Sequence, residues 1–270
     1  AKLRRGQFIM IREGTAARNL EALAPLLTPQ YAERCMFCTD DKHPNDLLEK
    51  GHIDYIVRRA IKAGVDPIIA VKCASHHAAR YFLLNNRGAI APGFLADFVV
   101  IDNFDDFNIL EVYKKGKLMF DGKTVTPFEA PEIDPHLVKR SHETFHVAHL
   151  EATDFIESRP RAVLGMVPGE IVTTDAGYAE KISVEDDILK IAVIERHKNT
   201  HHIGIGYIKG YGLKSGAVAT SISHDSHNII VVGANEEDMA AAVNRVVELG
   251  GGIVVMDDGK VLGELQLQIA

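Results

Sequence analysis

The sequence predicts an α/β fold that starts with strand–loop–helix units and ends in a separate α+β domain. Two short apolar segments, residues 7–11 and 34–38, each run into a polar loop and then into a helical pattern. Such units are typical of parallel α/β architectures, including the (β/α)8 barrel, where the loops after the strands carry the chemistry. Since a complete barrel needs about 250 residues, we expect about two of its eight units here.

Helices are predicted after both strands. Thr15 is expected to cap the first one, because apolar residues recur on one helical face from residue 16 to residue 27. A second amphipathic pattern runs over residues 48–61. Asp66 followed by Pro67 indicates the N-cap and first position of a third helix.

From residue 87 onwards the pattern changes to short strands. The Asp121–Gly122 step indicates a hairpin, and the Pro-rich residues 127–135 indicate a linker. Beyond the linker, apolar runs alternate with Gly-rich turns, and Asn235 is expected to cap a helix that stops at Gly250. The predicted strands cover residues 96–102, 109–113, 117–120, 162–166, 188–194, 217–222, 229–232 and 253–256. The predicted domain boundaries are 1–85, 86–130 and 131–270.

Composition and charge favour a cytoplasmic protein that handles a small molecule. The net charge of -7 and the pI near 6.0 argue against a nucleic-acid partner. No run of about 18 apolar residues predicts a membrane span, so no membrane partner is expected. Cys35 and Cys38 have the spacing of a metal or redox pair, but no second pair exists, and a buried strand is the favoured interpretation.

The strongest candidate site follows the second strand. Asp40 and Asp41 lie where the buried strand ends, and an acidic pair there is costly unless a cation or hydrogen-bond donors satisfy it. The alternative is that one of the two aspartates caps the next helix. Arg12 and Glu13 end the first strand in the same way, and their alternative is a solvated ion pair.

A second candidate lies in the C-terminal domain. His224 and His227 stand among Asp, Ser and Asn residues, which indicates a polar loop beside a site or a structural turn. Serine hydrolase chemistry has no support, because no Gly-x-Ser-x-Gly elbow occurs. Phosphate-binding and dinucleotide-binding glycine motifs are also missing from the sequence.

Four motifs carry a family resemblance. The segments 10–21, 37–54 and 223–233 resemble the adenine deaminases, with 37–44 reading Phe-Cys-Thr-Asp-Asp-Lys-His-Pro. The segment 87–100 resembles the general amidohydrolase superfamily, at the point where the chain leaves the barrel for a small β domain. The resemblance implies a fold made of the last strands and helices of an amidohydrolase (β/α)8 barrel, a small β domain segment and a C-terminal α+β domain.

The resemblance also implies a function and a metal. The family deaminates adenine to hypoxanthine and ammonia with water, using a divalent metal, manganese or iron and sometimes zinc. Asp40 is implied as metal ligand and general base, with Asp41 as the fallback, while Arg12, Glu13, His224 and His227 are candidates to bind the purine. No His-x-His occurs, so the remaining ligands are expected outside this chain, in a missing N-terminal half. We therefore expect the chain to be inactive alone, and a homo-oligomer is expected for the enzyme.

Two other functions stay open at the level of sequence. Another amidohydrolase, acting on a different cyclic amidine or cyclic amide, would share segment 87–100 but not the family-specific motifs. The second alternative is a catalytically silent C-terminal module that binds a ligand or completes an oligomer. Metal analysis of this chain alone would separate these interpretations, because one carboxylate holds a catalytic ion weakly.

Overall fold

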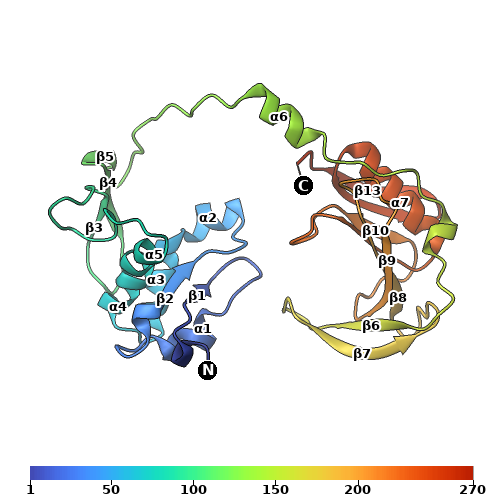
Figure 1. Ribbon diagram of the computed structural model, residues 1–270, viewed down its shortest axis with the longest axis horizontal. Helices are drawn as coiled ribbons and strands as arrows, with labels where there is room; N and C mark the ends of the chain where they lie inside the picture. The colour runs from blue at the N-terminus through green and yellow to red at the C-terminus, as the bar shows by residue number, and fades with distance from the viewer. Residues whose placement is uncertain (270) are drawn as a thin grey trace. The chain divides into compact units, whose positions relative to one another are not determined.

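The computed structural model describes residues 1–269 and divides the chain into two compact units, Ala1–Ala130 and Pro131–Ala270 (Figure 1). Each unit has a hydrophobic core of its own. Within the described residues, no helix is long and apolar enough to cross a membrane.

Two parallel strands form the centre of the first unit. β1 (Ile9–Arg12) pairs with β2 (Cys35–Cys38), and the register places Ile9 opposite Cys35 and Arg12 opposite Cys38. Both predicted strands are therefore confirmed. All three cysteines are free, and burial raises the pKa of Cys35, which fits a strand in the core better than a metal pair.

The helix predicted after β1 is mostly wrong. Residues 15–19 form a loop, and α1 covers only Leu20–Leu23 before a 3-10 turn at Ala24–Leu26. Thr15 is not an N-cap, because its hydroxyl group donates to Asp46 instead. Leu20, Ala24 and Leu27 are buried in the core. The apolar pattern therefore predicted burial correctly, but not a continuous helix.

The helical pattern over residues 48–61 belongs to two helices. α2 (Pro44–Lys50) ends at Gly51, whose φ of 101° breaks the helix, and α3 (Ile53–Lys62) follows. Because the two helices are separate, Leu48 does not share the buried face of α3 and is exposed.

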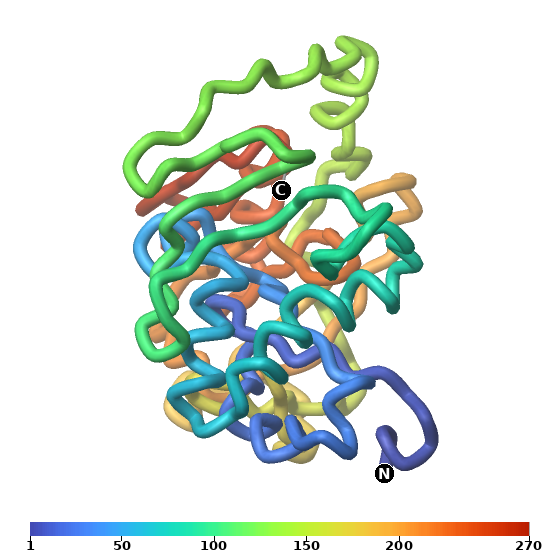
Figure 2. Tube along the Cα trace, turned by 90° about the vertical axis from the view of Figure 1, so that its left-hand side faces the viewer, coloured from blue at the N-terminus to red at the C-terminus, as the bar shows by residue number. Residues whose placement is uncertain are grey.

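The predicted Asp66 cap is confirmed, since its side chain accepts from the backbone N–H of Ile69 at 3.0 Å. α4 (Pro67–Ala74) and α5 (His76–Tyr81) complete the group of helical turns (Figure 2). α3, α4 and α5 all contact β2.

The three predicted short strands are confirmed, and they form an antiparallel sheet. They are β3 (Phe98–Ile101), β4 (Ile109–Lys114) and β5 (Lys117–Phe120). Asp121 accepts from two backbone N–H groups of the predicted hairpin turn. Phe107, Ile101 and Ile109 pack into the core around β1 and β2, so this sheet belongs to the first compact unit.

An eight-stranded mixed sheet dominates the second unit. Its order is β13-β12-β10-β11-β8-β9-β6-β7, with β6 and β9 parallel and the other neighbours antiparallel. The strands are β6 (Arg161–Met166), β7 (Thr173–Ala179), β8 (Ile188–Ile194), β9 (Ile203–Lys209), β10 (Ala217–Thr220), β11 (Ile229–Gly233), β12 (Gly252–Asp257) and β13 (Lys260–Gln266). The helices are α6 (Pro135–His142) and α7 (Glu236–Leu249), with a 3-10 turn at Ala152–Phe155.

Helix α7 covers one face of the part of this sheet that β10, β11, β12 and β13 form (Figure 1). Its predicted cap is confirmed, because the Asn235 side chain accepts from the backbone N–H of Asp238 at 2.7 Å. Its predicted end is also confirmed at Gly250, which has a φ of 69°. Met239, Val243 and Val246 are fully buried against the strands, so the helix stabilises the sheet through a continuous apolar face.

Candidate metal and substrate site

The polar residues after β1 and β2 come together because the two strands are parallel and in register. The backbone N–H of Glu13 continues the strand pairing by donating to the carbonyl oxygen of Cys38 at 3.1 Å. The loops after both strands therefore leave the sheet at the same edge. In parallel α/β folds, this carboxyl edge is where ligands bind.

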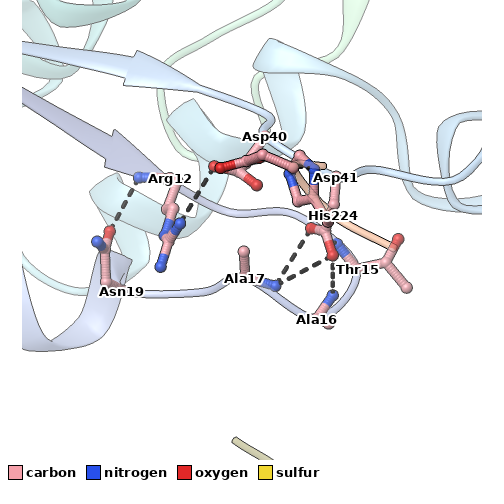
Figure 3. Close-up of polar contacts among 9 residues, drawn as sticks. Arg12, Thr15, Ala16, Ala17, Asn19, Asp40, Asp41 and His224 are labelled. Carbon is pink, nitrogen blue, oxygen red and sulfur yellow. Dashed lines mark hydrogen bonds and ion pairs between the residues drawn. The ribbon is translucent and has the colours of Figure 1, made fainter. Parts of the chain in front are cut away.

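Asp41 is held by the backbone of the loop after β1 (Figure 3). Its carboxylate accepts from the N–H groups of Thr15 at 3.0 Å and Ala16 at 3.1 Å. It also accepts from Ala17, at 3.2 Å to one oxygen and 3.3 Å to the other. Burial raises the pKa of Asp41, but the hydrogen bonds from these N–H groups lower it by more, so the net pKa lies below its ordinary value. Asp41 is therefore an ionised structural anchor.

Gly14 allows the Asp41 carboxylate to approach. A Cβ atom added at Gly14 would lie 1.9 Å from Asp41 Oδ1 and 2.9 Å from the carbonyl oxygen of Thr39. The second of these neighbours is backbone, which cannot move aside as a flexible side chain can. The close packing of the two loops thus requires glycine at this position.

A second bridge joins the same two loops. The Thr15 hydroxyl group donates to Asp46 Oδ2 at 2.7 Å and accepts from the backbone N–H of His43 at 2.9 Å. Asp46 also pairs with Lys50 at 2.7 Å. Hydrogen bonds from Lys50 and Thr15 lower the pKa of Asp46, so this carboxylate is ionised too. Together with Asp41, these contacts fix the loop that carries Asp40.

Asp40 has different surroundings. Its backbone has a φ of 50°, a left-handed conformation that Asp tolerates better than most residues. Arg12 Nη1 donates to Asp40 Oδ2 at 3.3 Å (Figure 3). Within residues 1–269, Asp40 Oδ1 has no hydrogen bond or ion pair, and the side chain is 28% exposed. Asp40 therefore offers an oxygen for binding, whereas both oxygens of Asp41 are engaged.

Arg12 and Glu13 are fixed by separate partners. The backbone N–H of Arg12 donates to Asn19 Oδ1 at 2.9 Å, which holds the strand end. Glu13 is 3% exposed and accepts from Arg59 Nη1 at 2.6 Å. Arg59 also pairs with Glu21. Glu13 thus forms an ion pair, as the alternative interpretation held, but its carboxylate is buried rather than solvated and its partner lies on α3.

Residues 1–269 offer one free carboxylate oxygen at this site but not a complete set of metal ligands. Among residues 1–269, no group of three or more His, Cys, Asp and Glu residues is arranged to hold a metal ion. The free carboxylate oxygen of Asp40 is a suitable ligand for a divalent cation. Catalytic zinc sites, however, use about three protein ligands. The free oxygen of Asp40 is therefore suited to be one ligand of a metal centre whose other ligands lie outside the described residues.

The second predicted site, His224 and His227, lies in the loop between β10 and β11. Both side chains are exposed, and His224 Nδ1 lies 2.8 Å from Asp225 Oδ1. The loop is braced by His197, whose Nε2 lies 2.9 Å from the carbonyl oxygen of Ser226. The backbone N–H of His227 donates to the carbonyl oxygen of Ser223 at 2.6 Å. These contacts show an ordered polar loop, and purine contact by its histidines stays a prediction.

Comparisons with known proteins give matches over most of the chain. A family model described as the Amidohydrolase family matches residues 9–119, and one described as the Adenine deaminase C-terminal domain matches residues 170–270. The chain is 44% identical to an adenine deaminase of Kosmotoga olearia and 44% identical to one of Desulfatibacillum aliphaticivorans. An adenine deaminase of Brucella abortus is 40% identical. Each match covers 100% of this chain and 47% or 48% of the relative.

The chain thus spans about half the length of the curated relatives it matches. Among solved structures, a beta-aspartyl dipeptidase from Fervidobacterium islandicum matches with a TM-score of 0.39 and 24% identity, over 47% of this chain and 35% of that chain. The two family models and the relatives together point to one family. The chain contains an amidohydrolase segment followed by an adenine deaminase C-terminal domain, and along its whole length it is similar to adenine deaminases.

Proposed function

We propose that this chain is part of an enzyme that deaminates adenine hydrolytically to hypoxanthine and ammonia, and that Asp40 is its catalytic residue in this chain. The observation that carries the proposal is the contrast between the two adjacent aspartates. Asp41 is engaged by three backbone N–H groups, whereas Asp40 has a free oxygen at the carboxyl edge of the strands. Relatives of which the chain covers about half are named adenine deaminase.

We assign the parts of the chain accordingly. Residues 1–85 are the last strands and helices of a (β/α)8 barrel, 86–130 are a segment of a small β domain, and 131–270 are the C-terminal α+β domain. The parallel pair β1–β2 with covering helices supports the first assignment. The other barrel strands and the remaining metal ligands come from the half of the enzyme outside this chain, and the enzyme is a homo-oligomer.

The family implies a divalent metal, which we take to be manganese or iron, with zinc as the alternative. When bound, such an ion lowers the pKa of a water molecule to about 7, which makes a nucleophile available at neutral pH. Asp40 would hold this ion as one of its ligands, through the oxygen that is not bonded to Arg12. Arg12 orients the Asp40 carboxylate through the contact at 3.3 Å.

Asp40 is also the proton carrier of the reaction. A carboxylate at this position accepts a proton from the attacking water and returns it to the purine ring or to the leaving amine, which departs as ammonia. Asp41, Thr15 and Asp46 hold the loop in place during this transfer. We propose Arg12, His224 and His227 for purine contact. Glu13 was also a candidate, but it is 3% exposed and its carboxylate accepts from Arg59.

Ammonia release by the full-length protein tests this function. With manganese or iron supplied, we expect adenine to be converted to hypoxanthine, and a panel of other cyclic amidines and cyclic amides to react far more slowly. Chromatography of the purine product would separate deamination from ring opening. Failure to turn over adenine while another member of the panel is hydrolysed would overturn the proposal.

A further inference from the structure

A cavity of about 540 Å³ lies in the second unit, and none of its lining residues belongs to the candidate site described above. It is lined by Tyr207 from β9, Lys190 from β8, Glu236 at the start of α7, and Glu157 and Glu180 from the flanking segments. Its size falls within the range of about 300–1,000 Å³ that is usual for small-molecule sites. A nucleobase-sized ligand would fit such a volume.

Tyr207 is the feature that points to a ligand. The residue is fully buried, and its hydroxyl group has no hydrogen-bond partner among residues 1–269. Buried hydroxyl groups are nearly always bonded, because an unbonded one loses its hydration without compensation. Burial raises the pKa of Tyr207, as do the charges of Glu236, Glu157 and Glu180. The group is therefore a neutral phenol that can donate to an acceptor atom in the cavity.

Lys190 stands beside Tyr207 but its charge is already balanced. The two residues are register partners in the β8–β9 pair, so their side chains lie next to each other on one face of the sheet. Lys190 is 3% exposed, and its Nζ donates to the carbonyl oxygen of Phe155 at 2.9 Å and pairs with Glu236. The lysine is therefore not a free anion-binding group.

The remaining charge around the cavity is negative. Four glutamates line it, at positions 157, 180, 185 and 236, against two lysines at 181 and 190. Glu157 is paired with Arg161, while Glu180 and Glu185 are exposed at the rim. A ligand here needs N–H groups for the carboxylates and one acceptor for the Tyr207 hydroxyl group. An anion would be repelled.

We propose that this cavity is a second ligand site, which binds a small uncharged nitrogen heterocycle of the nucleobase class. Its ring nitrogen or carbonyl oxygen accepts from the Tyr207 hydroxyl group, and its N–H groups donate to the Glu180 or Glu236 carboxylate. The choice of adenine as the probe rests on the proposed function. The site itself rests on the geometry of the second unit.

The test measures adenine binding to the 270-residue chain in metal-free buffer by equilibrium dialysis. We expect Tyr207→Phe to weaken binding about tenfold, which is the usual effect of losing one neutral hydrogen bond. Tyr211→Phe is the matched control, because Tyr211 lies in the same unit but lines a different cavity. Asp40→Asn should leave this binding unchanged. Urate, a purine that is anionic at neutral pH, should bind more weakly than adenine.

Folding is checked separately, by thermal denaturation without adenine. Tyr207→Phe removes only a hydroxyl group that has no partner, so its Tm should equal or exceed that of the wild type. No adenine binding, equal binding by wild type and Tyr207→Phe, or equal binding of urate would overturn the site. Loss of binding in Asp40→Asn would also overturn it. A full-length protein that fails to deaminate adenine but keeps Tyr207-dependent binding would refute the proposed function alone.

Discussion

Asp40 and Asp41 are neighbours in the sequence, yet their carboxylates have no partner in common. Asp41 accepts hydrogen bonds from the backbone of residues 15–17, while Asp40 faces the guanidinium group of Arg12 at 3.3 Å. The left-handed φ of 50° at Asp40 turns the chain between them. The Asp41 carboxylate therefore stabilises the loop, whereas the Asp40 carboxylate keeps one oxygen free to bind a ligand.

This division predicts different outcomes for the two Asp→Asn variants of the full-length enzyme. Asp40→Asn should lower kcat by at least about 10²–10⁴, the usual effect of losing a general base, while leaving Tm within a few degrees of wild type. Asp41→Asn should instead lower the free energy of unfolding by about 1–3 kcal/mol, because hydrogen bonds to backbone N–H groups are weakened. Steady-state kinetics and urea denaturation measure the two effects. If Asp41→Asn were stable but inactive while Asp40→Asn remained active, Asp41 would be the catalytic residue and Asp40 the structural one.

Gly14 gives a prediction about packing. Gly14→Ala should destabilise the protein by about 1–3 kcal/mol, because the new methyl group would overlap Asp41 and the backbone of Thr39. Gly263→Ala is the control, since a Cβ atom there meets nothing within 4 Å. Urea denaturation of both variants is the measurement. Equal stability of the two variants would show that the loops separate at little cost.

The sequence predicted those elements whose apolar pattern was uninterrupted. β1, β2 and α7 lie close to their predicted positions because each has a clear apolar face and a defined end. β7 and β9 were missed because Gly177, Gly204 and Gly206 interrupt the alternation. β13 was missed because it is an edge strand exposed along its whole length, so burial imposes no pattern.

The site could be predicted only in part, because its geometry depends on contacts between distant residues. The helix expected at Thr15 failed since Asp41, 26 residues later, holds that backbone as a loop. No local signal marks this contact. The choice between Asp40 and Asp41, and the pairing of Glu13 with Arg59, likewise arise from loop conformation and tertiary packing. Local sequence patterns identified the acidic pair but not the separate partners of its members.

The lowered pKa of Asp41 predicts how stability changes in acid. A carboxylate whose folded pKa lies below its unfolded value, about 3.9, stabilises the protein fully above that unfolded value. The contribution is lost as the pH falls through the folded pKa. The wild type should therefore lose stability more steeply than Asp41→Asn below about pH 4. Urea midpoints from pH 6 down to about pH 3 provide the measurement. If the urea midpoints of the two proteins fell equally with pH, the pKa of Asp41 would be the same in the folded and unfolded states.

The histidine loop of the second unit gives the last prediction. His224 and His227 are exposed on a loop that His197 and Ser223 hold in place, so each ring can be removed without disturbing the core. If the two rings contact the purine, His224→Ala and His227→Ala in the full-length enzyme should raise KM or lower kcat while the metal content stays constant. His149→Ala is the matched control, because His149 is also exposed in the same unit but lies outside the loop. Metal analysis and steady-state kinetics on the same preparations decide the outcome. Loss of metal would make either histidine a ligand, and unchanged kinetics in both variants would assign the loop a purely structural role.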